Sequence, residues 1–88
     1  MTIRDIETRR RRAAFRAAHR GTKEMDLLMG RFAEAHLAAM SEGMLAEFER
    51  LLEVPDTDLQ RWILAGGEQP GGGLAPWIAR LRAFHGLD

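Results

Sequence analysis

The chain has 88 residues, 45% of them hydrophobic, with no cysteine and a formal net charge of zero at pH 7. This length predicts one domain, which buries only about 60–65% of the surface that its unfolded chain exposes. The lack of cysteine excludes disulfide bridges, thiolate metal sites and a cysteine nucleophile. No apolar run approaches the ~20 residues of a membrane-spanning helix. We therefore expect a single domain over residues 1–88, cytoplasmic by default and without membrane insertion.

Positive charge is concentrated at the start of the chain. Residues 1–20 hold seven arginines against Asp5 and Glu7, so this segment has a formal charge of +5 and the remainder has −5. A basic arm attracts nucleic acid, anionic lipid or an acidic protein surface, and charge alone does not choose among them. The two carboxylates are atypical of a mitochondrial presequence, so we interpret the arm as part of the mature domain.

Apolar residues recur at helical spacing between breakers, and no segment alternates as a strand does. Five helices are predicted, at residues 5–19, 23–39, 42–53, 57–65 and 75–85. The expected fold class is all-α, a compact five-helix bundle with short loops. We further expect residues 1–7 to be frayed and the glycine-rich residues 66–73 to form a flexible linker before the last helix.

The first two helices meet at a charged glycine turn. The first helix has a thin core face, mostly alanine, and Gly21 suits the left-handed position that ends a helix. Thr22 is the predicted cap of the second helix, with Glu24 and Asp26 favourable at the positive end of its dipole. Residues that share one stripe of this helix are predicted to form the core: Met25, Leu28, Met29, Phe32, His36, Leu37 and Met40. We expect His36 to be packed and Met25 to reach both core and interface.

The later helices have clear boundaries. Ser41 is the predicted cap of the third helix, and Asp56 that of the fourth, after Pro55. Pro76 suits the first turn of the last helix, whose docking the sequence does not predict.

Residues for catalysis or for metal binding are lacking. The histidines are scattered, Thr22 and Ser41 are taken up by capping, and no phosphate-binding loop is present. Glu24 and Asp26 point in different directions on a helix, so they do not suit acid and base work. We predict that the chain is not an enzyme, with no catalytic, cofactor-binding or metal-binding residues.

Arginines 9–12 suggest an alternative, a basic helical nucleic-acid-binding regulatory module. The second helix argues against it, because the start Lys23-Glu24-Met25-Asp26 would bring carboxylates toward phosphates. We therefore expect no specific nucleic-acid partner.

A family resemblance begins at Arg20-Gly21-Thr22-Lys23-Glu24 and extends through residues 19–33, 48–53 and 55–62. In these segments the chain resembles the small succinate dehydrogenase assembly factors that have an Arg-Gly-x-x-Glu motif and promote covalent attachment of FAD. It departs from them at Ala18, where related chains often have a bulky aromatic residue, and in the glycine-rich segment.

The resemblance implies a non-catalytic helical protein that binds the flavoprotein subunit of succinate dehydrogenase, with fumarate reductase as a further client. It implies no stably bound cofactor, because the FAD belongs to the client and a client histidine attacks its 8α-methyl carbon. The implied partner-binding residues are Arg16, His19, Arg20, Gly21, Lys23, Glu24 and Asp26. The sequence leaves an alternative for Arg20 and Glu24, a surface ion pair worth about 0–1 kcal/mol.

Overall fold

The structure is a computed structural model that describes residues 3–67 and 70–87, with side chains from residue 5 onward. It confirms the all-α class, since the described residues form five α-helices and no strand. The molecule is elongated, with extents of 39 × 26 × 21 Å. The elements in chain order are α1 (Ile3–Ala18), α2 (Lys23–His36), η1 (Leu37–Ala39), α3 (Glu42–Leu52), α4 (Asp56–Gln60), η2 (Arg61–Ala65) and α5 (Ala75–Phe84).

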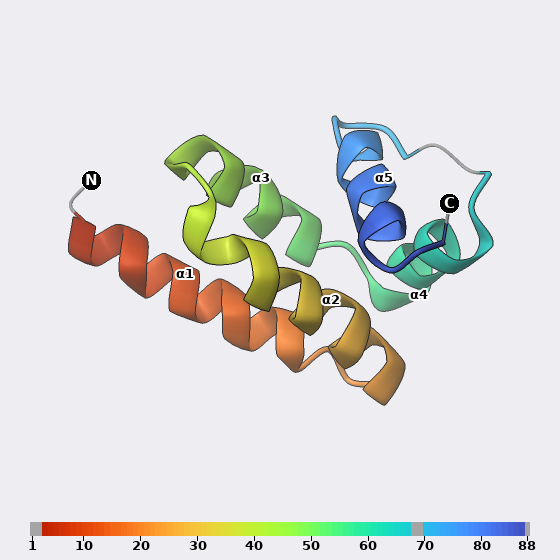
Figure 1. Cartoon of the computed structure of the whole chain (residues 1–88), viewed down its shortest axis with the longest axis horizontal. Helices are drawn as coiled ribbons and strands as arrows, with labels where there is room; N and C mark the ends of the chain where they lie inside the picture. Colours follow the sequence, from red (N-terminus) through yellow and green to blue (C-terminus); the bar gives the residue numbers. More distant parts are fainter. Residues whose placement is uncertain (1–2, 68–69, 88) are drawn as a thin grey trace.

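Helices α1 and α2 form an antiparallel hairpin, and α3 packs against α1 (Figure 1). Small residues bring the hairpin together. A Cβ added to Gly30 would lie only 3.1 Å from the Cα of Ala18, and α1 contributes Ala13 and Ala17 to the core. Ala18 therefore lies where the backbones of the two helices approach closely.

A single core runs through all five helices. Its fully buried large side chains are Phe32, Phe48, Met25, Met29, Met40, Leu45, Leu51, Leu59, Ile63 and Leu81. Met25 is 0% exposed, so the prediction that it reaches an interface is wrong. His36 is packed as predicted, between the rings of Phe32 and Phe84 at centroid distances of 4.7 and 5.4 Å.

The second and fourth helices differ from the prediction in their last turns. The second ends as an α-helix at His36 and continues as the 3₁₀ turn η1, and the fourth becomes the π-helical η2 after Gln60. The Thr22 and Ser41 caps are confirmed, with hydrogen bonds of 3.2 Å from Met25 N and 3.1 Å from Met44 N. The Asp56 cap is wrong, because Pro55 occupies the cap position and the Asp56 side chain is engaged elsewhere.

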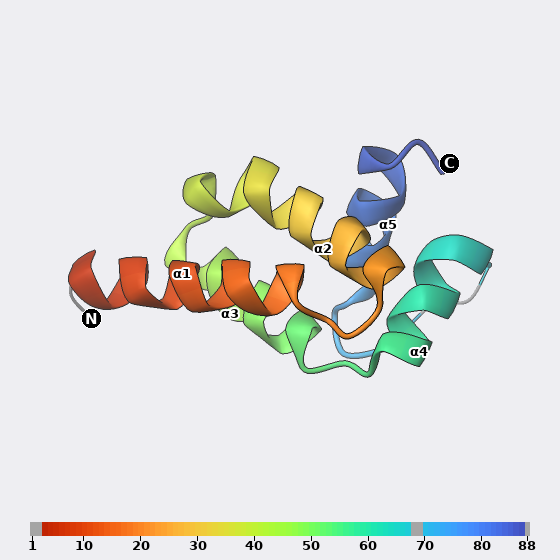
Figure 2. The same cartoon turned by 90° about the horizontal axis from the view of Figure 1, so that it is seen from below.

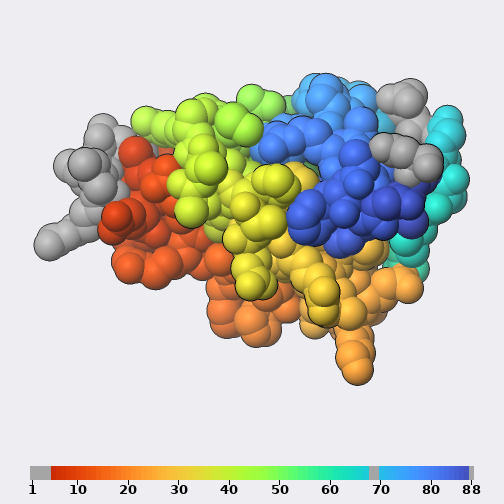
Figure 3. Space-filling view, in the orientation of Figure 1, coloured from red at the N-terminus to blue at the C-terminus, as the bar shows by residue number. Residues whose placement is uncertain are grey.

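Helix α5 packs against α2 and η2, and its atoms adjoin those of α2 on the surface in Figure 3. Trp77, Ile78 and Leu81 are its buried side chains. Trp77 Nε1 donates a hydrogen bond of 3.0 Å to Glu47 Oε1 on α3, and the Arg82 guanidinium donates to the Ile63 carbonyl in the middle of η2. The last helix is thus a fixed part of the domain.

Parts of the predicted frayed arm and of the predicted linker lie outside the described residues. Residues 1–2 and 68–69 are not described, whereas Ile3 to Glu7 form the first turns of α1. Within the linker, Gly66, Gly67, Gly72 and Gly73 have positive φ angles between 68° and 79°. The predicted flexibility of this segment stays a prediction.

Candidate functional site

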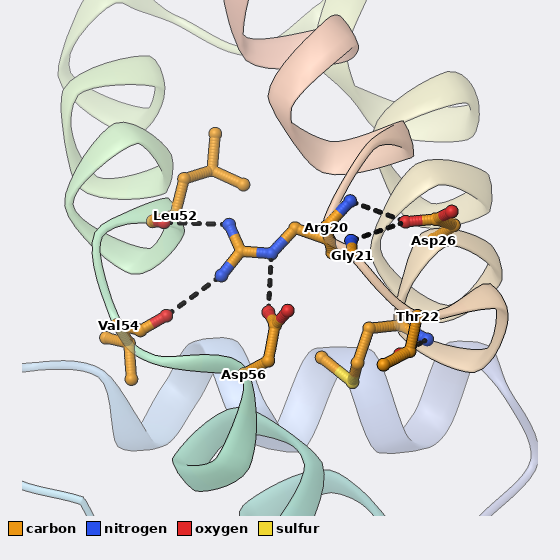
Figure 4. Close-up of polar contacts among 8 residues, drawn as sticks. Arg20, Gly21, Thr22, Asp26, Leu52, Val54 and Asp56 are labelled. Carbon is orange, nitrogen blue, oxygen red and sulfur yellow. Dashed lines mark hydrogen bonds and ion pairs between the residues drawn. The ribbon is translucent and has the colours of Figure 1, made fainter.

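The turn between α1 and α2 is closed by Asp26. Its Oδ1 accepts hydrogen bonds from the backbone amides of Arg20, at 2.5 Å, and Gly21, at 3.3 Å (Figure 4). Helix α1 ends at Ala18, so Gly21 does not directly end the helix as predicted but shapes the turn that follows, with φ of +118°. Asp26 is half-buried and acts within the turn, where its charge also favours the N-terminal end of α2.

The Arg20 side chain points into the molecule and not toward solvent. Its Nε donates to Asp56 Oδ1 at 2.7 Å, Nη1 to the Leu52 carbonyl at 2.7 Å and Nη2 to the Val54 carbonyl at 2.9 Å (Figure 4). The side chain is 9% exposed. These two carbonyls lie at and just beyond the C-terminal end of α3, where a helix has unpaired acceptors and a negative dipole end. Arg20 therefore joins the α1–α2 turn to the α3–α4 loop.

The sequence-based alternative of a surface ion pair between Arg20 and Glu24 is not what the structure shows. Glu24 is exposed, and its Oε1 accepts a hydrogen bond of 2.8 Å from Gln60 Nε2 on α4. Gly21 and Lys23 are also exposed. We call Gly21, Lys23 and Glu24 the turn edge. The edge offers a bare backbone position, a cation and a carboxylate on a turn held in place by Asp26 and Arg20.

The predicted flanking residues lie on the last turns of α1. Arg16 Nη2 is 2.7 Å from Glu53 Oε1 in an exposed ion pair. The Nδ1 of His19 is 2.8 Å from the Phe15 carbonyl, and its ring stacks on the Phe15 ring with centroids 4.0 Å apart. An open hollow of about 180 Å³ is lined by Phe15, Arg16, His19 and Arg20. The flanking residues thus continue the turn edge onto α1.

The structure therefore divides the predicted site residues into two groups. Arg20 and Asp26 hold the turn, and the others lie at the surface: Arg16, His19, Gly21, Lys23 and Glu24. Asp56 and Gln60 were missed as members of the site. Both contact it from 36 residues away along the chain, and no local pattern marks such a contact.

The arginine run 9–12 is split by the helix. Arg9 Nη2 lies 2.5 Å from Glu49 Oε1, and this hydrogen bond raises the pKa of Arg9. Arg10 Nη2 donates to the Met40 carbonyl at 2.8 Å. Arg11 and Arg12 are exposed. Half of the run thus braces α1 against the η1–α3 region and is not free to bind phosphates.

Within residues 3–67 and 70–87, no group of three or more His, Cys, Asp and Glu side chains is placed to hold a metal ion. None of the described helices is long and apolar enough to cross a membrane.

These observations define a small all-α domain that presents a charged turn at its surface, held in place by the contacts of Asp26 and Arg20. Over residues 11–85 the chain matches the family described as "Flavinator of succinate dehydrogenase". The chain belongs to this family, as the resemblance in the sequence predicted.

Individual relatives agree with this assignment. The chain is 39% identical over 77 residues to "FAD assembly factor SdhE" of Acetobacter pasteurianus, a match that covers 88% of this chain and 71% of the relative. It is 41% identical over 56 residues to "Succinate dehydrogenase assembly factor 2, mitochondrial" of Meyerozyma guilliermondii, covering 64% of this chain and 42% of that protein. The chain is also 37% identical over 68 residues to the protein of the same description in Dictyostelium discoideum. This match covers 77% of this chain and 48% of that protein. The chain thus spans less than half of these mitochondrial relatives. No solved structure matches.

Proposed function

We propose that this chain binds the flavoprotein subunit of succinate dehydrogenase and promotes the covalent attachment of FAD to it. The family description and the bacterial relative's description as an FAD assembly factor support this function. We also propose fumarate reductase as a second client, by analogy between its flavoprotein subunit and that of succinate dehydrogenase. The comparisons give no support to the nucleic-acid-binding alternative.

The turn edge is the proposed contact with the client. The supporting observation is that Asp26 and Arg20 fix the backbone of this turn while Gly21, Lys23 and Glu24 stay exposed. A bare glycine permits close approach of a partner backbone. A cation and a carboxylate beside it set the orientation of the partner through complementary charges. Arg16 and His19 extend this contact onto α1, whereas Arg20 and Asp26 contribute by holding the geometry.

The proposed role is not enzymatic, and it needs no stably bound cofactor. The client supplies FAD and the attacking histidine, and this chain would favour the arrangement in which the bond forms. Thr22 and Ser41, two of the few hydroxyl side chains, accept capping hydrogen bonds. The cytoplasmic location expected from the sequence is likewise a proposal, which cell fractionation followed by immunoblotting of the chain tests.

The function is tested by deleting the gene and measuring covalently bound flavin in the denatured flavoprotein subunit by in-gel fluorescence. We expect a strong loss of covalent flavin, restored by the wild-type gene on a plasmid. Normal flavin content in the deletion strain, with no second family member in its genome, would contradict the proposal.

A further inference from the structure

The outward side of α1 presents an aromatic ring among arginines. Phe15 is 63% exposed, the highest value among the large hydrophobic residues described as exposed. An open hollow of about 350 Å³ beside it is lined by Thr8, Arg11, Arg12, Phe15 and Arg16. We call Arg11, Arg12, Phe15 and Arg16 the arginine face. In Figure 2, α1 runs along one side of the molecule with no other helix in front of it.

The positive charge of the arginine face is largely uncompensated. Within the described part of the chain, Arg12 makes no hydrogen bond or ion pair, and Arg11 has only a 3.5 Å contact with Thr8 Oγ1. Arg16 pairs with Glu53, but the Glu53 side chain is 71% exposed, and pairs of this kind are weak and readily exchanged. This face therefore differs from Arg9 and Arg10, which have acceptors inside the domain.

The Phe15 ring is also held in position. It stacks on the His19 ring at a centroid distance of 4.0 Å and an interplanar angle of 18°, and His19 Nδ1 is 2.8 Å from the Phe15 carbonyl. An exposed ring that is ordered before binding loses little conformational freedom when a partner covers it. Aromatic and arginine side chains together are the usual centres of binding energy in protein interfaces.

We propose that the arginine face binds an acidic segment of a protein partner, which places carboxylates against Arg11, Arg12 and Arg16 and a large apolar side chain beside Phe15. Arginine pairs with carboxylates through two parallel hydrogen bonds, and the ring buries the apolar group. A protein segment is favoured over nucleic acid because the chain has zero net charge and only three arginines on this face. Tight binding to a nucleic acid needs more Lys and Arg side chains, because its affinity depends on the number of phosphates that they neutralise.

The arginine face is a second contact surface that contains none of the three turn-edge residues. It shares Arg16 with the proposed client contact, and Phe15 and Arg16 also line the smaller hollow with His19 and Arg20. Its existence does not depend on the identity of the client. A test on the isolated chain therefore separates failure of this inference from failure of the proposed function.

The test uses the full chain and a fluorescein-labelled synthetic peptide of glutamates with a central pair of leucines, followed by fluorescence anisotropy at low salt. A second peptide with glycines in place of the leucines reports on charge alone. We expect Arg12→Glu and Phe15→Ala each to weaken binding of the leucine peptide about tenfold. Phe15→Ala should leave the weak binding of the glycine peptide unchanged.

Matched controls lie on other surfaces. Arg31→Glu reverses an exposed charge on α2, and Leu64→Ala removes a side chain of η2 that is 41% exposed. Neither should change binding. Amide shifts in a ¹⁵N–¹H spectrum of the unmodified chain, which need no variant, should move along α1 when the leucine peptide is added.

Three results would overturn the inference. In the first, Phe15→Ala binds the leucine peptide as tightly as the wild type. The peptide would then be bound through charge alone, without contact between its leucines and Phe15. In the second, Arg31→Glu weakens binding as much as Arg12→Glu, or the shifts fall outside α1. In the third, a single-stranded oligonucleotide binds more tightly than the leucine peptide at the same ionic strength.

Discussion

An ion pair between Arg20 and Asp56 connects the α1–α2 turn to the start of α4, with Nε 2.7 Å from Oδ1. Arg20 follows the first helix and Asp56 begins the fourth, and the same guanidinium also donates hydrogen bonds to the carbonyls of Leu52 and Val54. The arginine of the Arg-Gly-x-x-Glu motif in this chain therefore sets the position of the turn edge from within. Its effect on a partner would pass through the glycine and glutamate that it holds at the surface.

Replacing Arg20 should destabilise the domain. Arg20→Ala leaves the Asp56 carboxylate and two carbonyls without their donor, and we expect a loss of about 2–3 kcal/mol in the free energy of unfolding. Urea unfolding followed by far-ultraviolet circular dichroism measures this loss. Arg12→Ala, which removes an arginine that has no internal partner, should stay within about 0.5 kcal/mol of the wild type. Equal stability of the two variants would show that Arg20 does not hold the turn.

Replacing Glu24 should separate function from stability. Because Glu24 is exposed and its one described contact is with Gln60, Glu24→Ala should cost no more than about 0.5 kcal/mol of unfolding free energy. We expect it nevertheless to lower covalent flavin in the client when it replaces the wild-type gene. Glu34→Ala, at another exposed position of α2, is the matched control and should flavinylate normally. A folded Glu24→Ala protein that supports normal covalent flavin in the client would contradict the proposal for the turn edge.

Gly21 should resist substitution for conformational reasons and not for lack of space. A Cβ at this position would meet only Asp56 Oδ2, at 3.9 Å, but the φ angle of +118° is one that L side chains rarely adopt. Gly21→Ala should therefore cost about 1–3 kcal/mol, and Gly21→Arg should be worse at the interface because it also adds bulk.

Gly43→Ala is the control for the backbone effect. Gly43 lies in the first turn of α3 and an added Cβ there approaches only Ser41 Oγ, at 3.9 Å. This substitution should stabilise the domain by up to about 1 kcal/mol, since alanine loses less chain entropy than glycine on folding. If both substitutions shifted the thermal midpoint in the same direction, strain at Gly21 would not be the cause.

The docking of α5 should depend mainly on Trp77. Its side chain is 3% exposed, and Trp77→Ala should cost about 3–5 kcal/mol through lost burial and a residual cavity. Glu47→Gln keeps an acceptor for the indole N–H and should cost less than about 1 kcal/mol. Limited proteolysis checks this prediction, because a detached α5 would be cleaved within the glycine-rich segment. Cleavage of the Glu47→Gln variant at the same rate as Trp77→Ala would contradict the prediction that packing of Trp77 dominates the docking of α5.

Much of the fold could be predicted because its signals are local. The Thr22 and Ser41 caps each bind an amide three residues ahead, and the core stripe of α2 repeats at helical spacing. The change from α4 to the π-helical η2 has no local marker in the residues. The docking of α5 likewise depends on side chains of α2, α3 and η2 that are remote in sequence.

The site was predicted in position but not in its internal arrangement. Glycine between charged residues indicated the turn, and the family resemblance indicated its use. The direction of Arg20 could not be predicted, because an arginine at the end of a helix is ordinarily exposed and its partner Asp56 was an equally reasonable helix cap. Phe15 presents the same difficulty, since a lone aromatic residue in an alanine-rich helix is expected in the core and here is exposed.

Both tryptophans of the chain, Trp62 and Trp77, lie in η2 and α5, while α1, α2 and the turn edge contain none. The indole emission of the free protein therefore reports on η2 and α5 and has no source within α1 or the turn edge. A shift in that emission on adding a tryptophan-free fragment of a partner would show that binding changes the surroundings of η2 or α5. An unchanged spectrum alongside measurable binding would identify a rigid scaffold.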